Sequence, residues 1–174
     1  MIRAFIAIDL PSKIKDKIKQ IQAELPEFAG KKTELENLHL TLKFLGEIDE
    51  EKIEKVKEKL NEIKTNKFQA EIDEIGVFSE KFVRIVWVHL VGCQEIQKQI
   101  DEKLSDIFKP ERRFMSHITI ARVKKIDDKN SFIDDVKKIK IKPVSFDVDK
   151  IYLKKSTLMP EGPVYENLFV LGLD

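Results

Sequence analysis

The residues that could carry chemistry are two copies of a His-x-Thr-x motif. The first is His39-Leu-Thr-Leu42, and the second, 78 residues later, is His117-Ile-Thr-Ile120. Residues i and i+2 of a strand point to the same face, so each motif offers an imidazole beside a hydroxyl. The chain has three His in total, and two of them share this setting. The recurrence indicates a common role rather than two ordinary surface pairs.

Two imidazoles and two hydroxyls brought face to face would suit in-line displacement at phosphorus. Histidine titrates near neutral pH, so one ring can start neutral as a base and the other protonated as an acid. The hydroxyls of Thr41 and Thr119 can bind the non-bridging oxygens, where charge accumulates. No metal is required, because the acid neutralises the leaving group, and two His with two Thr make a poor zinc shell. These residues alone do not decide which His is the acid.

The elements that must position the motifs recur in the same order in each half of the chain. Alternation of apolar residues predicts strands, and spacings of three and four predict helices. The expected strands are 2–9, 38–45, 68–78, 82–91, 117–123, 144–154 and about 164–172, and the expected helices are 11–25, one that begins after Asp49 and runs to about 63, 94–108 and 129–139.

This recurrence predicts an internal duplication within one bilobal domain that spans residues 1–174. The approximate repeats are 1–79 and 80–157, with a closing strand at 164–172. Two copies of one unit usually pack about a pseudo-twofold axis, which would bring the two motifs opposite each other. We therefore expect an α+β fold with antiparallel sheets that face a central cleft and helices packed on the outside. No glycine fingerprint follows any strand, which argues against a dinucleotide site.

Composition narrows the function classes. The 174 residues include 32 basic and 31 acidic side chains, so no global charge indicates a nucleic-acid coat protein. A single cysteine, Cys93, excludes an internal disulfide and any metal cage built on Cys clusters. The apolar segment at the start of the sequence is interrupted by Asp9 and Pro11 and is therefore too short for a signal peptide. No other apolar run is long enough to span a membrane. We expect a cytoplasmic monomer that acts without a membrane.

The paired motifs resemble those of the RNA 2′,3′-cyclic phosphodiesterases, also called 2′-5′ RNA ligases or LigT-like proteins, in the two-histidine phosphoesterase superfamily. Three further segments extend the resemblance over essentially the whole chain: Arg3–Pro11, Arg84–Val88 and Tyr152–Tyr165. One departure is Ser116, which stands directly before the second His where the family often has proline. This difference removes no catalytic group.

The resemblance implies an activity and a role for each motif residue. The activity is opening of an RNA terminal 2′,3′-cyclic phosphate to a 2′-phosphomonoester, a hydrolase reaction of RNA processing. His39 would be the acid on the leaving 3′-oxygen and His117 the base that activates water, while Thr41 and Thr119 hold the phosphate. Run in the opposite sense with an RNA 5′-hydroxyl, the same site would join ends through a 2′-5′ linkage. No cofactor is implied, since the cyclic phosphate is already activated.

Supporting residues for substrate binding come from the neighbourhood of the motifs. Strict alternation puts Lys43 on the face of His39 and Thr41, whereas it puts Arg122 on the far face of its strand unless a bulge redirects it. The family has an arginine at this place that contacts substrate, so Arg122 remains a candidate. Aromatic rings stack the bases of single-stranded RNA ends. The candidates for that role are Phe5, Phe44, Phe114 and Tyr152.

Two alternatives remain open at this point. One is a non-catalytic RNA- or nucleotide-binding module, and the other is a phosphodiesterase for a small cyclic nucleotide phosphate. The third histidine, His89, lies on an apolar strand without a Thr partner. We interpret it as a packed or solvent-facing residue.

Overall fold

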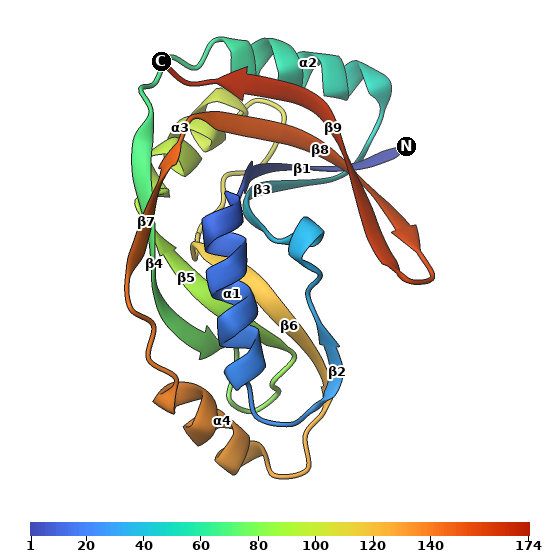
Figure 1. The fold of residues 1–174 in the computed structure, drawn as a ribbon. Coiled ribbons are helices and arrows are strands. Elements are labelled where there is room, and N and C mark those ends of the chain that lie inside the picture. Colours follow the sequence, from blue (N-terminus) through green and yellow to red (C-terminus); the bar gives the residue numbers. More distant parts are fainter.

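The computed structural model describes all residues from 1 to 174 and contains one nine-stranded sheet with four α-helices (Figure 1). The strands are β1 (Ile2–Asp9), β2 (Ala29–Lys32), β3 (His39–Ile48), β4 (Phe68–Val77), β5 (Ile85–Val91), β6 (His117–Lys125), β7 (Val144–Val148), β8 (Lys150–Met159) and β9 (Gly162–Gly172). The helices are α1 (Ser12–Glu24), α2 (Glu50–Asn61), α3 (Gln94–Lys103) and α4 (Lys129–Lys138), with a short 3-10 turn η1 (Leu35–Asn37).

Every strand pairing is antiparallel, in the order β7-β4-β5-β6-β3-β1-β8-β9, with β2 also paired to β6. The two motif strands, β3 and β6, therefore lie side by side in the middle. They meet through a single pair, Leu40 opposite Ile118, and then diverge. The antiparallel pairing confirms the expected α+β fold. The Leu40–Ile118 pair joins the two halves into one open sheet at the point where the motifs begin.

The two halves of the sheet correspond strand for strand. β1, β3 and β8 on one side match β5, β6 and β4 on the other: Ala7 lies between Thr41 and Tyr152, just as Trp87 lies between Thr119 and Gly76. Duplication of a unit over residues 1–79 and 80–157, with the closing strand 164–172 added, would produce this correspondence. We propose that duplication as the origin of the fold.

The helices leave the motif-bearing side of β3 and β6 open. They contact the sheet through apolar side chains such as Ile14, Ile18 and Ile100, which are fully buried, and α1 and α3 lie against β6 and β3 respectively. In Figure 1, α1 crosses in front of β5 and β6. The Asp49 carboxylate accepts a hydrogen bond from the Lys52 amide at 2.8 Å and caps α2 as expected. No helix is long and apolar enough to cross a membrane.

Two expectations about the elements were wrong in detail, and one further segment carried no expectation. The stretch expected as one strand over 144–154 is two strands, because the chain crosses at Asp149 from β4 at one side of the sheet to β1 and β9 at the other. The segment 29–37, which carried no expectation, forms β2 and η1. The third helix ends at Lys103 rather than near 108, and turns follow it.

Candidate active site

The four motif residues share one face of the sheet. His39, Thr41, His117 and Thr119 are partly exposed, while the intervening Leu and Ile side chains are buried in the core. The pair Leu40–Ile118 fixes the register between the motifs. The strands diverge on either side of this pair, and each motif presents its own imidazole and hydroxyl to the shared face.

Each catalytic candidate ring is held by a backbone carbonyl. His39 Nδ1–H donates to the Asn37 carbonyl oxygen, and His117 Nδ1–H donates to that of Met115, both at 2.7 Å. A proton held on Nδ1 leaves Nε2 as the acceptor of the neutral ring. Nε2 of His39 lies 3.1 Å from the Thr41 hydroxyl. Both rings therefore present the nitrogen that can take or give a proton to the face they share.

A β-bulge redirects Arg122 to the motif face. In the pairing of β5 with β6, Trp87 lies opposite Thr119 and Val86 opposite Ala121, so Ile120 has no partner of its own. The extra residue shifts the alternation, which leaves Ile120 and Ala121 both buried and Arg122 exposed. Arg122 consequently shares the side of His117 and Thr119, the condition under which it remained a candidate.

The equivalent bulge makes the expectation for Lys43 wrong. Ile6 of β1 lies opposite Lys43 and Ala7 opposite Thr41, so Leu42 is the unpaired residue and alternation shifts there. Lys43 turns to the core side and is 6% exposed. Its ammonium group donates to the Asp101 carboxylate and, at 2.9 Å, to the Lys109 carbonyl. Lys43 therefore does not share the face of His39 and Thr41.

Phe44 takes the place on the motif side that alternation assigned to Lys43. Its ring is 57% exposed, stacks on Phe5 at 5.8 Å between centroids and lies under the guanidinium of Arg3 at 5.6 Å. Phe5 is buried and packs 5.0 Å from the ring of His39. A row of aromatic rings thus leads from His39 to an exposed face.

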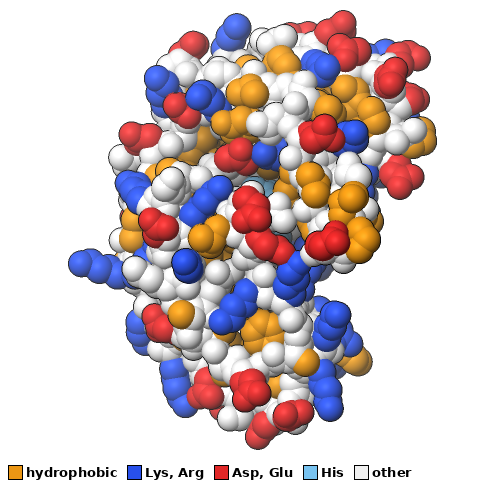
Figure 2. Space-filling view, turned by 45° about the vertical axis from the view of Figure 1, so that its right-hand side comes forward, with side chains coloured by type: hydrophobic (Ala, Val, Ile, Leu, Met, Phe, Trp, Pro, Cys, Tyr) orange, Lys and Arg blue, Asp and Glu red, His pale blue; other side chains and the backbone are white.

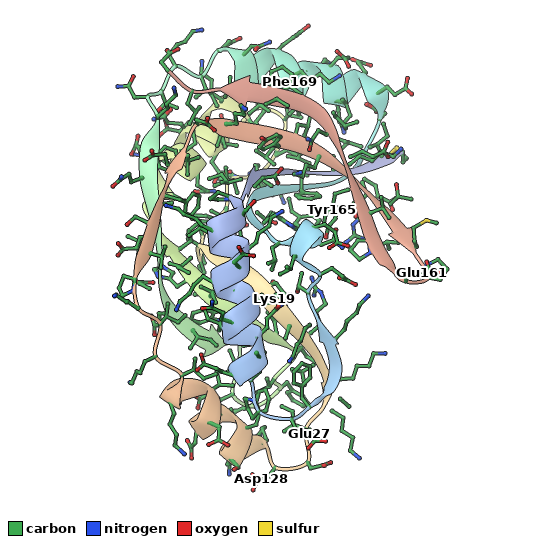
Figure 3. All side chains as sticks on the ribbon, viewed as in Figure 1. Lys19, Glu27, Asp128, Glu161, Tyr165 and Phe169 are labelled. Atoms are coloured by element: carbon green, nitrogen blue, oxygen red, sulfur yellow. The ribbon has the colours of Figure 1, made fainter.

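Tyr165 of β9 adds another aromatic ring beside His39, although sequence reasoning did not select it. Its ring lies edge-on to both Phe5 and His39, at 5.1 Å from each. Figure 3 places Tyr165 where β9 passes close to η1, and Glu161 at the tip of the β8–β9 hairpin. That hairpin is anchored by Asn37 Nδ2, which donates to the Pro163 carbonyl at 3.1 Å. No local pattern identifies Tyr165, because a strand from the far end of the chain brings it in.

The other two aromatic candidates differ in position. Tyr152 of β8 lies opposite Ala7 on the motif face, and Lys154 Nζ lies 5.0 Å from the centre of its ring. Phe114 packs against the hydrophobic core from the loop before β6, and we do not include it in the site. On the other wall, Phe78 lies edge-on to His117 at 4.8 Å. Sequence reasoning did not select Phe78.

Figure 2 shows histidine atoms at the bottom of a hollow near the middle of one face, with charged side chains of both signs around it. Beside His39, the buried Lys154 donates to Asp9 at 2.9 Å and to the Asn167 side-chain oxygen at 2.8 Å. Burial lowers the pKa of both His39 and His117 below the ordinary 6.5, and the positive charge of Arg122 acts in the same direction on both. No group of three or more His, Cys, Asp or Glu side chains is placed to hold a metal ion.

Comparison with known proteins identifies the family. The sequence matches the family of LigT-like phosphoesterases over residues 8–87 and 92–165, and each stretch contains one His-x-Thr motif. The chain belongs to the LigT-like phosphoesterase family. The resemblance predicted from the two motifs is confirmed.

Relatives of this family match nearly the whole chain. The RNA 2′,3′-cyclic phosphodiesterase of Methanocaldococcus jannaschii is 42% identical over 171 residues, which cover 95% of this chain and 97% of that protein. That of Archaeoglobus fulgidus is 35% identical over 178 residues, 97% and 99% of the two chains. A crystal structure of Escherichia coli LigT with 3′-AMP superposes with a TM-score of 0.80 at 27% identity and covers 99% of this chain and 98% of that one. The LigT-like fold is therefore shared from end to end.

Proposed function

We propose that this LigT-like protein opens the terminal 2′,3′-cyclic phosphate of RNA to a 2′-phosphomonoester by metal-independent acid–base catalysis. The observation that carries the proposal is the pair of imidazoles on one face, each held at Nδ1 by a backbone carbonyl 2.7 Å away. Nε2 of His39 also lies 3.1 Å from the Thr41 hydroxyl. The names of the relatives and the 3′-AMP complex of Escherichia coli LigT support an RNA end as substrate.

The reaction balances with these groups alone. A water oxygen attacks phosphorus while the bond from phosphorus to the 3′-oxygen breaks. His117 Nε2 takes the proton of the attacking water, and His39 Nε2 gives its proton to the departing 3′-oxygen. Because the acid neutralises the leaving oxygen, the step needs no Lewis acid. An RNA 5′-hydroxyl in place of water would give a 2′-5′ linkage.

The two walls of the site support His39 as the acid. The leaving 3′-oxygen belongs to the nucleoside, so in-line geometry puts the nucleoside on the side of the acid. The exposed ring of Phe44, backed by Phe5, lies on the His39 side. An exposed aromatic ring can stack a base without reading its identity. Tyr165 borders the same region.

Thr41, Thr119 and Arg122 are suited to hold the phosphate. The hydroxyls flank the two imidazoles, and the Arg122 guanidinium lies close enough to influence both His39 and His117. Negative charge gathers on the non-bridging oxygens in the transition state, where fixed donors and a cation lower its energy most.

The test is hydrolysis, in the presence of EDTA, of an RNA oligonucleotide that ends in a 2′,3′-cyclic phosphate. We expect a 2′-phosphate product, identified by chromatography, at a rate that EDTA leaves unchanged. A protein that binds this RNA without turnover would instead be a binding module. Faster hydrolysis of a nucleoside 2′,3′-cyclic phosphate than of the oligonucleotide would point to a small cyclic nucleotide as substrate. Loss of activity in EDTA that added metal restores would contradict the metal-independent step.

The lowered pKa values of the two histidines set the expected pH dependence. Below both pKa values His117 is protonated and cannot act as base, and above both His39 is neutral and cannot act as acid. Since burial lowers both from 6.5, the productive state with one proton is most populated below that pH. We expect kcat/KM, which reports the free enzyme, to be bell-shaped with its maximum below pH 6.5. A maximum at pH 7.5 or above would show that the two groups are not these histidines.

A further inference from the structure

A third imidazole lies next to the proposed base. His89 of β5 is the direct antiparallel partner of His117 in β6. Directly opposed residues of antiparallel strands point to the same face, so His89 shares the face of the motif residues. Its side chain is 25% exposed. His89, interpreted from the sequence as a packed or solvent-facing residue, is partly exposed on the face that carries the motifs.

The position of His89 and His117 in the ladder favours close side chains. The next pair along is joined by a backbone hydrogen bond, from Leu90 N–H to the Ser116 carbonyl at 3.2 Å. In an antiparallel ladder, hydrogen-bonded pairs alternate with narrower pairs whose side chains lie closer together. His89 and His117 consequently form one of the narrower pairs.

His89 is oriented in the same way as His117. Its Nδ1 lies 2.8 Å from the Asp73 carboxylate, which holds a proton there. A register shift in β4 between Ile72 and Ile75 sets Asp73 across from His89. With Nδ1–H directed at Asp73, Nε2 of the neutral ring is an acceptor. In its neutral form each of the two imidazoles presents one acceptor nitrogen, Nε2, that no protein group binds.

The other half of the molecule lacks this feature. The position equivalent to His89 is Asp9, which is the antiparallel partner of His39. The Asp9 carboxylate forms an ion pair with the ammonium group of Lys154, with 2.9 Å between Oδ1 and Nζ. The extra acceptor thus exists only beside His117, the side from which the nucleophile attacks under the proposed function.

We propose that His89, held by Asp73, positions the attacking water by accepting its second hydrogen while His117 accepts the first. This rests on the proposed function. Water has two O–H bonds to satisfy both nitrogens, whereas an alcohol, including an RNA 5′-hydroxyl, has one. The His89–Asp73 pair therefore favours hydrolysis over transfer to an alcohol. In both reactions phosphorus gains one oxygen and loses the 3′-oxygen, and only the group carried by the entering oxygen differs.

Methanol competition measures this preference inside a single reaction. A 2′,3′-cyclic oligonucleotide is turned over in buffer with a fixed share of methanol, and the 2′-phosphate and its methyl ester are separated and counted. We expect His89→Ala to lower hydrolysis about fivefold, the scale of one net hydrogen bond, and methanolysis less. The ratio of ester to 2′-phosphate then rises about threefold or more. Because it is a ratio, it does not depend on the fraction of folded enzyme.

Matched variants make the result decisive. Asp73→Asn, which keeps the shape of the side chain and weakens the hold on Nδ1, should move the ratio in the same direction. Glu74→Gln removes the exposed carboxylate next to Asp73 and should leave it unchanged. A wild-type ratio in both His89→Ala and His89→Gln would overturn the role of His89. Absence of any turnover by the wild-type protein would instead refute the proposed function, so the two failures are separable.

Discussion

Replacing His117 by alanine is expected to lower kcat for cyclic-phosphate opening by about 10² or more, and His39→Ala should do the same. This is the usual scale for removal of a positioned acid or base. Under the proposed mechanism the two groups act in one step, so the double variant should be little slower than either single one. The rate is measured by product formation in single-turnover and steady-state experiments with the oligonucleotide substrate.

Two controls separate lost chemistry from lost structure. Each variant should keep its thermal transition near that of the wild type, because both rings are only partly buried on the open face. Added imidazole should restore part of the activity of His117→Ala, since a free base can enter the space that the ring leaves. A variant that retains a third or more of the wild-type rate would show that its histidine carries neither proton.

Replacing Lys43 by methionine is expected to lower the free energy of unfolding by about 3 kcal/mol, the loss typical when one partner of a buried ion pair is removed. The Asp101 carboxylate would remain buried without its cation, although Gln97 and the Glu111 amide still donate to it, both at 2.8 Å. Urea denaturation measures the change, and the melting temperature should fall by about 10 °C. Lys55→Met, which breaks an exposed pair with Glu51, should leave the midpoint of urea denaturation close to that of the wild type.

The double variant Lys43→Met with Asp101→Leu should recover part of the loss, because it removes the unpaired charge as well.

Burial raises the pKa of Asp101, but the hydrogen bonds from Lys43, the Glu111 amide and Gln97 outweigh it and the pKa lies below the ordinary 3.8. A lowered pKa contributes stability that is present above pH 3.8 and is lost as the pH falls through the value in the folded protein. If Lys43→Met proves no less stable than Lys55→Met, the pair does not hold the fold.

The sequence predicts which side chains share a face only as far as the alternation of the strands is regular. That alternation breaks at the fourth residue after each motif histidine. Within His39–Leu42 and His117–Ile120 strict alternation holds, so the shared face of the histidines and threonines could be predicted from period two alone. One residue later a bulge in each strand shifts the phase, and the expectation for Lys43 became wrong while Arg122 turned toward the site. A bulge depends on pairing with a neighbouring strand, and a single strand carries no sign of it.

Long-range pairing also limited what could be predicted of the surroundings. Tyr165 and Lys154 reach His39 from the β8–β9 hairpin, more than 100 residues along the chain. His89 belongs to a strand whose apolar character was evident, but its place beside His117 is set by the β5–β6 register. The site was thus predictable where its chemistry is local and duplicated, and not where distant strands supply the walls.

The crossing of the chain at Asp149 has a further consequence. The first half sends β4 to lie beside β5 of the second half, and the second half sends β8 to lie beside β1 of the first. Each half therefore contributes its last strand to the part of the sheet that holds the other half's motif. Cutting the chain in the turn between β4 and β5 would leave two fragments that stay interlocked. Conversely, one half made alone could complete its sheet only by exchanging strands with a second copy of itself. A motif histidine from each copy would then lie at the interface.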